Sequence, residues 1–287
     1  MDNLNHNQIR EIVLKSLIKS AKTKFLVALS GGIDSILLLN IVNEICKDKE
    51  YQVRAIHINH NISKNADAMH NQCISICDNY NIQLIVKKIY KVENSNIEEN
   101  LRNERYKQIF ESMYDDEALL LGHHNDDQIE TFLYRLFRGS SPNGLSCMQK
   151  ISHRENKVLC RPFLKISKEN ILHIGKILNI KYINDSSNND ISFDRNYIRK
   201  EVIPKIKNKW KSINSVMDHN IQLQSDYSRL AHDYCNSLIK DIIIDNKLDI
   251  KKLKSHPIYL ESTFIKFWLK NYVGYNLSKN EISQIQL

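Results

Sequence analysis

The stretch Phe25-Leu26-Val27-Ala28-Leu29-Ser30-Gly31-Gly32-Ile33-Asp34-Ser35 decides the fold class. Its first five residues form a continuous apolar run, which is typical of a strand covered on both faces of a parallel sheet. A short polar loop follows, and the residues after Ser35 have the apolar content of a buried helix. The stretch therefore predicts a strand, a tight loop and a helix in direct succession.

The loop at residues 30–35 has the composition of an anion site. Ligands of open α/β sheets bind beyond the carboxyl ends of the strands, where the next helix directs its backbone N–H groups. Gly31 and Gly32 allow close approach of the backbone, and Ser30 and Ser35 add hydroxyl groups. A tight turn that needs glycine for a positive φ explains the two glycines as well. The sequence contains no GxxxxGK[ST] motif, so a Walker loop is excluded. It also contains no GxGxxG motif, which argues against a dinucleotide-binding fold of that kind.

Three further apolar runs, at residues 53–58, 84–86 and 118–121, alternate with helix-length segments at 35–46, 64–80 and 97–114. This alternation indicates βαβ units. We predict an α/β fold with a doubly wound, mainly parallel sheet through about residue 195. Residues 184–197 are polar and are predicted to be irregular. After Pro204 the apolar spacing becomes helical, so we predict two domains, residues 1–204 and a smaller, mainly α-helical domain at 205–287.

The positive charge lies mostly in the second part of the chain. The 287 residues contain 41 Lys and Arg against 33 Asp and Glu, a net charge of +8. Residues 196–287 hold 15 of the basic and 9 of the acidic residues, including the run Lys205, Lys207 and Lys209. A basic region of this kind suits a polyanion such as nucleic acid, although a solvated helical face explains it equally well.

Residues 1–20 are polar and helical in pattern, and they contain no apolar run long enough for a signal peptide or a membrane span. We therefore expect a cytoplasmic protein without a membrane partner. The six cysteines are scattered, with no CxxC pair. We expect buried, reduced thiols.

Several further motifs lie between residues 57 and 199. They are His57-Ile58-Asn59-His60-Asn61-Ile62-Ser63, Gly122-His123-His124-Asn125-Asp126-Asp127-Gln128-Ile129-Glu130-Thr131, Arg161-Pro162-Phe163-Leu164, Asp185-Ser186-Ser187-Asn188 and Arg195-Asn196-Tyr197-Ile198-Arg199. Together with SGGIDS, their order and spacing over residues 24–204 resemble the tRNA(Ile)-lysidine synthetases. That family is part of the PP-loop ATP pyrophosphatase superfamily.

The resemblance implies a PP-loop, Rossmann-like catalytic domain at residues 1–204 and a tRNA-binding domain at 205–287. It also implies a two-step ligation. ATP first adenylates the C2 oxygen of the wobble cytidine in a CAU-anticodon tRNA(Ile), which releases pyrophosphate. The ε-amine of L-lysine then displaces AMP and forms lysidine. The sequence leaves a homodimer open. Residues 277–282 resemble the start of the family's appended helical domain, so a truncated chain and a short natural form both stay open.

For the first step, the resemblance implies that Ser30, Gly31, Gly32, Ile33, Asp34 and Ser35 hold the leaving pyrophosphate. A carboxylate inside an anion loop needs a cation, so Asp34 is the predicted Mg²⁺ ligand. Adenosine is expected near Ala28, His57 and Gly122.

The second step needs a neutral amine, and free lysine is mostly protonated near neutral pH. A carboxylate that positions and deprotonates it is expected. Asp127 is the candidate, with His123 one helical turn before it. His123 and His124 are explained equally well as a polar strand end that caps the next helix, and Asp126 as an N-terminal helix charge. The predicted catalytic set is Asp34, His123, Asp127, Arg195 and Arg199.

Two pairs of arginines have helical spacing. Arg102 and Arg105 are three apart and are expected to hold phosphate or the lysine carboxylate, unless they form surface ion pairs with nearby glutamates. Arg195 and Arg199 are four apart, and we expect them to contact an anion or the substrate. The predicted substrate-binding set is Arg102, Arg105, Asp126, Lys205, Lys207 and Lys209.

Two alternatives remain at this point. A tRNA thiolase of the same superfamily shares the SGGxDS motif but usually carries paired CxxC cysteines, which this chain lacks. The second alternative is a non-catalytic, nucleotide-dependent RNA-binding protein. Such a protein would have the same fold and a basic helical domain, but would lack the acidic residues at positions 34 and 127. The presence of Asp34 and Asp127 favours an enzyme.

Overall fold

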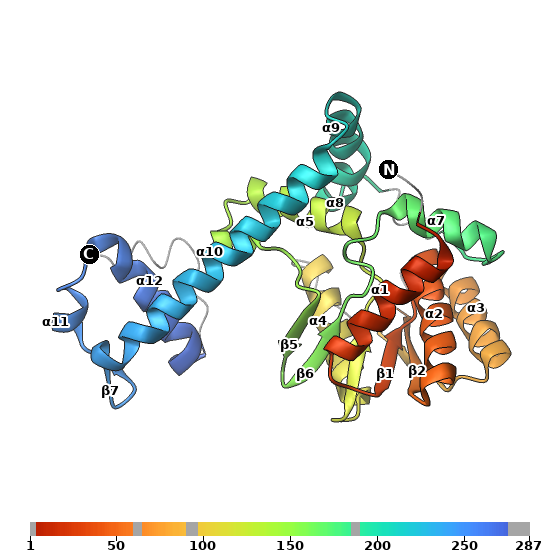
Figure 1. Cartoon of the computed structure of the whole chain (residues 1–287), viewed down its shortest axis with the longest axis horizontal. Helices are drawn as coiled ribbons and strands as arrows, with labels where there is room; N and C mark the ends of the chain where they lie inside the picture. The colour runs from red at the N-terminus through yellow and green to blue at the C-terminus, as the bar shows by residue number, and fades with distance from the viewer. Residues whose placement is uncertain (1–3, 60–64, 90–96, 185–189, 275–287) are drawn as a thin grey trace. The chain divides into compact units, whose positions relative to one another are not determined.

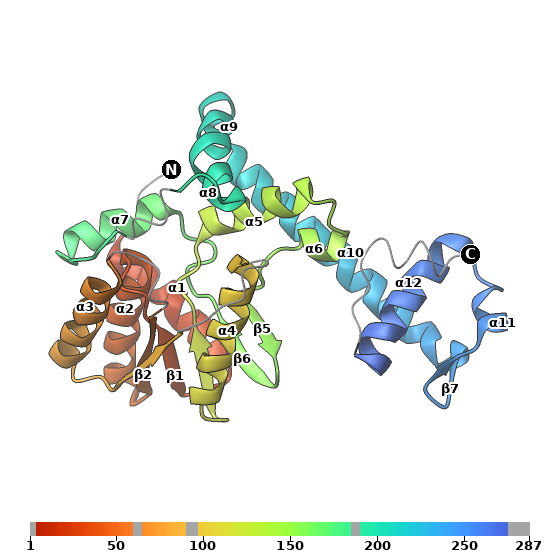
Figure 2. The ribbon, with the colours of Figure 1, turned by 180° about the vertical axis from the view of Figure 1, so that it is seen from behind.

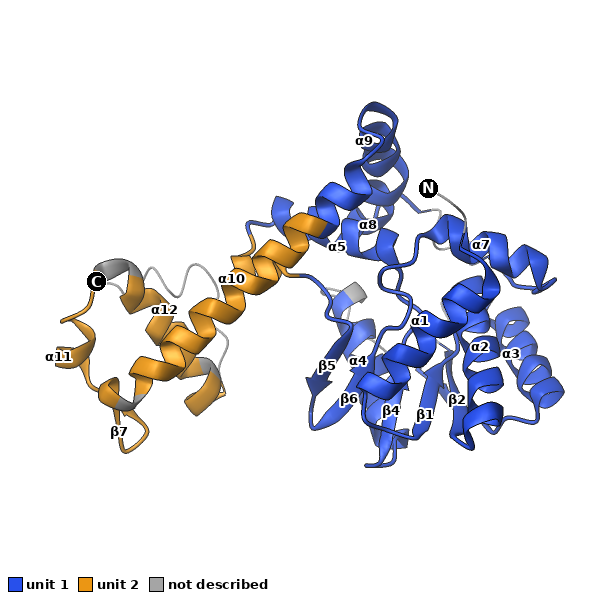
Figure 3. Ribbon diagram, in the orientation of Figure 1, with its two compact units in different colours: residues 1–139, 147–218 blue, residues 140–146, 219–287 orange. Residues whose placement is uncertain are grey.

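A computed structural model of the chain describes residues 4–59, 65–89, 97–184 and 190–274. Two compact units are present, residues 1–139 with 147–218 and residues 140–146 with 219–287 (Figure 3). The boundary between the units, at 218/219, lies beyond the predicted domain boundary at 204/205. Helix α9, Ile203–Lys209, accounts for this difference, because Lys207 forms an ion pair with Asp126 inside the first unit.

A six-stranded sheet forms the centre of the first unit, with the strand order β3-β2-β1-β4-β6-β5 (Figure 1). The strands are β1 (Lys24–Ala28), β2 (Gln52–Asn59), β3 (Leu84–Lys88), β4 (Glu117–Leu120), β5 (Ile151–Arg154) and β6 (Lys157–Cys160). All neighbouring pairs are parallel except β5 and β6. This confirms the predicted α/β fold with its mainly parallel sheet.

The helical elements of the first unit are α1 (His6–Lys19), α2 (Ile33–Lys49), α3 (Ala66–Tyr80), α4 (Ile97–Ser112), α5 (Asn125–Phe137), α7 (Lys168–Ile177), α8 (Asp194–Tyr197), a π-helical turn (Ile198–Val202) and α9. Of these, α1, α2, α3 and α7 pack on one face of the sheet and α4 packs on the other. Alternate residues of β1 pack into two different cores. Phe25 and Val27 join the core with α1, α2, α3 and α7, whereas Leu26 joins the core with α4. The apolar run is continuous because both faces of its strand are buried.

Figures 1 and 2 show α1 and α4 on opposite sides of the sheet, in agreement with the two cores. The strand order changes direction at β1: β2 and β3 lie on one side of it, and β4, β6 and β5 lie on the other. A crevice beyond the carboxyl ends of β1 and β4 is the usual ligand position in such sheets.

Two features of the first unit differ from the sequence prediction. The β5–β6 hairpin was not predicted, because its turn is formed by Glu155 and Asn156 at positive φ without the usual glycine. Residues 184–197 were predicted to be irregular, but Asp194–Tyr197 form α8. That polar turn begins the helical segment that continues through the π-helical turn into α9.

The second unit is mainly helical, as predicted. Its elements are α6 (Pro142–Leu145), most of α10 (Ile213–Ile242), the hairpin β7 (Ile243–Ile244) and β8 (Lys247–Leu248), α11 (Ile250–Leu253), α12 (Ile258–Trp268) and a π-helical turn (Leu269–Val273). Its core contains Cys235, Ile239, Leu253 and Phe264. Within the described part of the chain, none of the helices has the length and apolar character needed to cross a membrane.

All six cysteines are free, and five of them are buried. Burial raises the pKa of Cys46 and Cys73 to about 12 and that of Cys77 to about 11. These thiols are therefore protonated at neutral pH, as expected for packed cysteines.

Candidate active site

A cavity of about 450 Å³ lies at the carboxyl ends of β1, β2 and β4 and at the start of α2. We call it the first cavity. Predicted site residues that line it are Ala28, Ser30, Gly32, Ile33, Asp34, Ser35, His57, Arg105, Gly122, His123 and Asp127. We call the loop at residues 30–35 the phosphate loop, after its predicted role. The parallel sheet brings this loop and the histidine motifs together.

The phosphate loop is held in shape by its two serines. The backbone N–H of Ser30 donates to Oγ of Ser35 at 3.0 Å, and Ser35 Oγ donates to the carbonyl of Gly32 at 3.0 Å. Gly31 has φ +88°, and an added Cβ would lie 3.1 Å from Cβ of Met69. The turn therefore requires glycine both for its conformation and for space. The tight-turn explanation therefore holds at Gly31, and the anion-binding role of the loop stays a prediction.

Gly122 is required by a close approach between two elements. A Cβ at this position would lie 3.1 Å from the carbonyl carbon of Asp34 and 3.2 Å from the nitrogen of Ser35. The segment after β4 therefore passes directly against the start of α2. This contact places His123 and Asp127 beside the phosphate loop.

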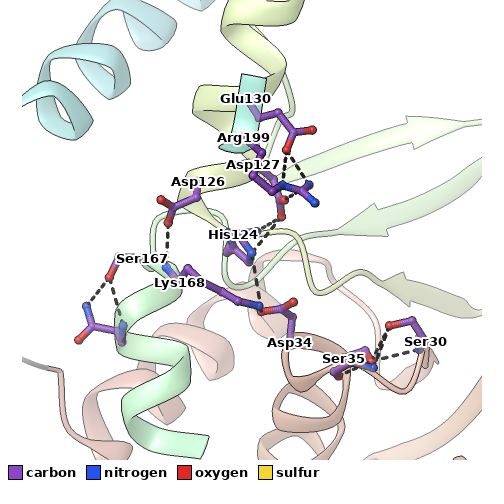
Figure 4. Close-up of polar contacts among 12 residues, drawn as sticks. Ser30, Asp34, Ser35, His124, Asp126, Asp127, Glu130, Ser167, Lys168 and Arg199 are labelled. Atoms are coloured by element: carbon purple, nitrogen blue, oxygen red, sulfur yellow. Dashed lines mark hydrogen bonds and ion pairs between the residues drawn. The ribbon is translucent and has the colours of Figure 1, made fainter. Parts of the chain in front are cut away.

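Asp34 is paired with a lysine that the sequence analysis did not identify. Nζ of Lys168, the first residue of α7, lies 2.5 Å from Oδ1 of Asp34 (Figure 4). Nε2 of His124 is 3.7 Å from the same oxygen. No local signal marks Lys168, because the pairing joins residues 134 positions apart.

The two adjacent acids of α5 have different surroundings. Asp126 accepts a hydrogen bond from the backbone N–H of Lys168 at 2.9 Å and forms an ion pair with Lys207. Burial alone would raise the pKa of Asp126, but the hydrogen bonds from Lys207 and Lys168 lower it by more. The pKa of Asp126 is therefore lowered from its ordinary value of 3.8. Asp126, predicted to bind substrate, is absent from the described lining of both cavities. It joins α5 to α7 and α9 instead.

Asp127 lines both cavities and also caps its own helix. Its Oδ2 accepts a hydrogen bond from the backbone N–H of His124 at 2.9 Å, and His124 Nε2 lies 3.5 Å from the same oxygen (Figure 4). His124 is the N-cap residue of α5, as the capping interpretation proposed. The placement of His123 one helical turn before Asp127 was wrong, because α5 begins at Asn125 and His123 precedes it.

The two histidines of the first cavity are neutral. Burial lowers the pKa of His123 well below 6.5, and nearby Arg161 and Arg105 lower it further. Burial also lowers the pKa of His57, whose Nδ1 lies 2.9 Å from the carbonyl oxygen of Leu29 and donates to it. Neither His123 Nδ1 nor His57 Nε2 has a hydrogen-bond partner among the described residues. Both unpartnered nitrogens are buried within the walls of the cavity.

A second cavity of about 300 Å³ adjoins the first, and Arg105, His123 and Asp127 line both. Its other lining residues are Leu101, Arg102, Glu130, Thr131, Arg135, Met148, Arg195 and Arg199. These side chains come from α4, α5, the segment before β5, α8 and the π-helical turn. The second cavity therefore combines segments that are far apart in the sequence.

Glu130 is the buried acid at the centre of this arrangement, and only 4% of its side chain is exposed. Arg199 Nε donates to its Oε2 at 2.8 Å, and Arg195 Nη1 lies 3.8 Å from its Oε1. Burial raises the pKa of Glu130, although both arginines oppose that shift. The shared partner agrees with the expectation that Arg195 and Arg199 face one side. Glu130 itself was not predicted, although it stands three residues after Asp127.

The arginines of α4 also reach the cavities. Arg105 is half-buried and lines both, whereas Arg102 lines the second. Burial lowers the pKa of the Arg105 guanidinium. Glu104, one of the expected surface partners, instead accepts a hydrogen bond from Gln108 at 2.9 Å. The positions of the two arginines suit contact with an anion.

The structure separates the three lysines of α9. Lys205 lies 3.5 Å from Glu201, Lys207 is paired with Asp126, and Lys209 lies 5.1 Å from the ring centre of Trp210. Their role in RNA binding stays a prediction. The motif residues 60–63, 185–188 and 277–282 lie outside the described residues.

Residues 4–206 match the family described as the PP-loop domain. Similar proteins include the tRNA(Ile)-lysidine synthase of Buchnera aphidicola subsp. Acyrthosiphon pisum (strain APS), 38% identical over 260 residues, or 90% of this chain and 59% of that protein. The tRNA(Ile)-lysidine synthase of Wigglesworthia glossinidia brevipalpis is 35% identical over 89% of this chain and 66% of that protein. The chain therefore spans less than two thirds of the length of these relatives.

Among solved structures, the fold is similar to the U34-tRNA thiolase NcsA from Methanococcus maripaludis. The TM-score is 0.61 at 18% sequence identity, and the match covers 76% of this chain and 78% of that one. At this identity the likeness concerns the fold alone.

Proposed function

The chain belongs to the PP-loop domain family, and on that premise we propose that it joins lysine to the wobble cytidine of a CAU-anticodon tRNA(Ile). The proposal rests mainly on one observation: the two cavities adjoin and share the lining residues Arg105, His123 and Asp127. One cavity contains a phosphate loop, and the other contains paired acids and arginines. The names of the tRNA(Ile)-lysidine synthases that it resembles over about 90% of its length support the same reaction.

The first step is assigned to the first cavity. The C2 oxygen of cytidine attacks the α-phosphorus of ATP, the bond to the bridging β-oxygen breaks, and pyrophosphate leaves with the electron pair. We assign the N–H groups at the start of α2 and the hydroxyl of Ser30 as donors to that leaving group, while Ser35 shapes the loop. His57 and His123 line the same cavity, and burial lowers the pKa of both, which favours uncharged imidazoles beside the nucleotide.

The residues of the first cavity also fit a magnesium ion. Asp34 presents a partly exposed carboxylate beside the phosphate loop, and Mg²⁺ is commonly held by one or two carboxylates together with phosphate oxygens. Bound there, the ion would neutralise charge on the phosphates. ATP and Mg²⁺ are thus the proposed requirements of the first step.

The second step is assigned to the second cavity. Five arginines line it, Arg102, Arg105, Arg135, Arg195 and Arg199, together with two acids, Asp127 and Glu130. This mixture suits lysine, which carries a carboxylate at one end and an ammonium group at the other. The ε-ammonium must lose a proton before its nitrogen attacks C2 and AMP leaves with the electron pair. Asp127, which faces both cavities, is our candidate to hold that amine.

The thiolase alternative has less support. Among the described residues that line the two cavities, none is a cysteine. The likeness to the archaeal thiolase rests on the fold at 18% identity. Chemistry that needs cysteine thiolates has no side chain at this site to supply them.

We assign additional tRNA contacts to the mainly helical second unit and to the basic segment before it, residues 199–211, which holds six of the 15 basic residues of the region 196–287. An enzyme that acts on tRNA with ATP is expected in the cytoplasm. The first unit holds the anticodon at the two cavities under this proposal.

The proposal is tested by incorporation of labelled lysine into a CAU-anticodon tRNA(Ile) with ATP and Mg²⁺. The product is then treated with mild base, which removes aminoacyl esters and leaves a base-linked lysine. We expect base-stable label that depends on ATP. Pyrophosphate release without any base-stable label would assign the second step to another nucleophile.

A further inference from the structure

The first cavity contains a cation that no sequence motif accounts for. Two of its lining side chains, His57 and His123, are kept neutral by burial. Among the described lining residues, positive charge therefore comes from Arg105 and Lys168. Arg105 lines both cavities, whereas Lys168 contacts the phosphate loop itself through Asp34.

The backbone of Lys168 is fixed to α5. Its N–H donates to Oδ2 of Asp126 at 2.9 Å, and two residues earlier the carbonyl of Ile166 accepts a bond from the N–H of Asn125 at 2.9 Å. Ser167 caps α7 by accepting from the backbone of Asn170. These bonds involve none of the side-chain atoms of Lys168.

The side chain of Lys168 has a different kind of attachment. Its Nζ is held on Asp34 at 2.5 Å, and 35% of the side chain is exposed (Figure 4). An ion pair exposed to this degree contributes little to stability. The four-carbon stem of lysine lets the ammonium group move while its Cα stays in place. Lys168 is therefore a tethered cation beside the phosphate loop.

We propose that Lys168 binds the β- and γ-phosphates of ATP, and hence the leaving pyrophosphate, after moving there from Asp34. The inference rests on the nucleotide step of the proposed function. Mg²⁺ bound by the carboxylate of Asp34 would repel the ammonium group that lies on Oδ1 of the same residue, and that ammonium is already beside the anion site. Pyrophosphate gains charge as the α–β bond breaks, so a cation placed there stabilises the transition state.

The same ion pair has a second use, before nucleotide binds. Without a partner, the carboxylate of Asp34 would repel phosphate from the loop that is built to receive it. Lys168 neutralises that carboxylate until Mg²⁺ and ATP arrive together. One residue thus serves as counter-ion to the acid first and to the phosphates afterwards.

The test measures binding to the intact chain by calorimetry in the presence of Mg²⁺. The probes are α,β-methylene-ATP, which cannot be cleaved between its α- and β-phosphates, inorganic pyrophosphate, and AMP. The variants are Lys168→Ala and Lys168→Arg, with Lys176→Ala as a matched control. Lys176 is exposed and lies on the same helix.

We expect Lys168→Ala to weaken binding of the ATP analogue and of pyrophosphate by about 10- to 100-fold, the usual loss for a charged hydrogen bond. AMP binding should stay the same, because AMP lacks the two outer phosphates. Lys168→Arg should retain most of the affinity, and Lys176→Ala all of it. Unchanged AMP binding also shows that the variant is folded.

Two results would overturn the inference while leaving the proposed function intact. One is equal affinity of the wild type and Lys168→Ala for the ATP analogue. The other is a parallel loss of AMP affinity, which would place Lys168 elsewhere on the nucleotide. Failure of the wild-type chain to bind the analogue at all would instead contradict the nucleotide step, and the role of Lys168 with it.

Discussion

The two cavities of the first unit are built in opposite ways. The phosphate loop of the first cavity is one continuous hexapeptide at the end of β1, and it presents mainly backbone groups and hydroxyls. The second cavity is lined by charged side chains from α4, α5, α8 and the π-helical turn. A site made of backbone dipoles depends on local conformation, whereas a site made of buried charges depends on every partner being in place. Mutations should therefore affect the two cavities differently.

Asp34→Ala should have the largest effect, because it removes the carboxylate from the first cavity. We expect tRNA-dependent pyrophosphate release to fall by about 10³-fold at saturating ATP and Mg²⁺. The control is Asp48→Ala, which removes an exposed acid of the same helix. Normal turnover of Asp34→Ala would contradict the assignment of Mg²⁺ to this residue.

Two adjacent acids of α5 can be compared directly, because Asp127 is assigned to catalysis and Asp126 to holding helices together. Asp127→Asn should keep the fold, because an amide oxygen can still accept the bond from the backbone of His124. Lysine transfer should nevertheless fall by about 10²-fold. Asp126→Asn should keep activity within a few-fold, because its carboxylate is bonded to Lys168 and Lys207. The assignment fails if the activity losses of the two variants are reversed.

Asp126 should also make a pH-dependent contribution to stability. Asp126→Asn should lower the free energy of unfolding by about 1–3 kcal/mol at pH 7, as measured by urea denaturation. The folded-state pKa of Asp126 lies below 3.8, so its contribution is complete above that value and is lost as the pH falls through the lowered pKa. The difference between wild type and variant should therefore shrink in acid. A constant difference from pH 7 to pH 3 would show that the charge is not responsible.

The smallest effects are expected at α9. Joint replacement of Lys205 and Lys209 by Ala should reduce the salt dependence of tRNA binding by at most about two phosphate contacts, with unchanged stability. Lys207→Ala should lower stability instead, because Lys207 is paired with Asp126. An unchanged salt dependence in the double variant would identify both lysines as solvated surface residues.

The first cavity could largely be predicted from sequence, because its parts are local. The strand at residues 25–29 and the loop at 30–35 are contiguous, and parallel pairing brings the ends of β1, β2 and β4 to the same edge. The β5–β6 hairpin was missed because the turn residues Glu155 and Asn156 give no glycine signal.

The second cavity was predicted only in part. Arg195 and Arg199 were found by their spacing, but their shared partner Glu130 was not, because its role arises from contacts with residues 65 or more positions away. In the first cavity, Lys168 was missed for the same reason. A motif shows which residues are adjacent in the chain, but it contains no information about long-range ion pairs.

The most direct test of the division between the cavities is Glu130→Gln. The substitution removes the buried charge that holds Arg195 and Arg199 and leaves the phosphate loop unchanged. Single-turnover assays should follow pyrophosphate release and lysine incorporation with the same tRNA. We predict pyrophosphate release within a few-fold of wild type and lysine incorporation reduced by about 10²-fold. A parallel loss of both, or undiminished lysine incorporation, would contradict separate sites for the two steps.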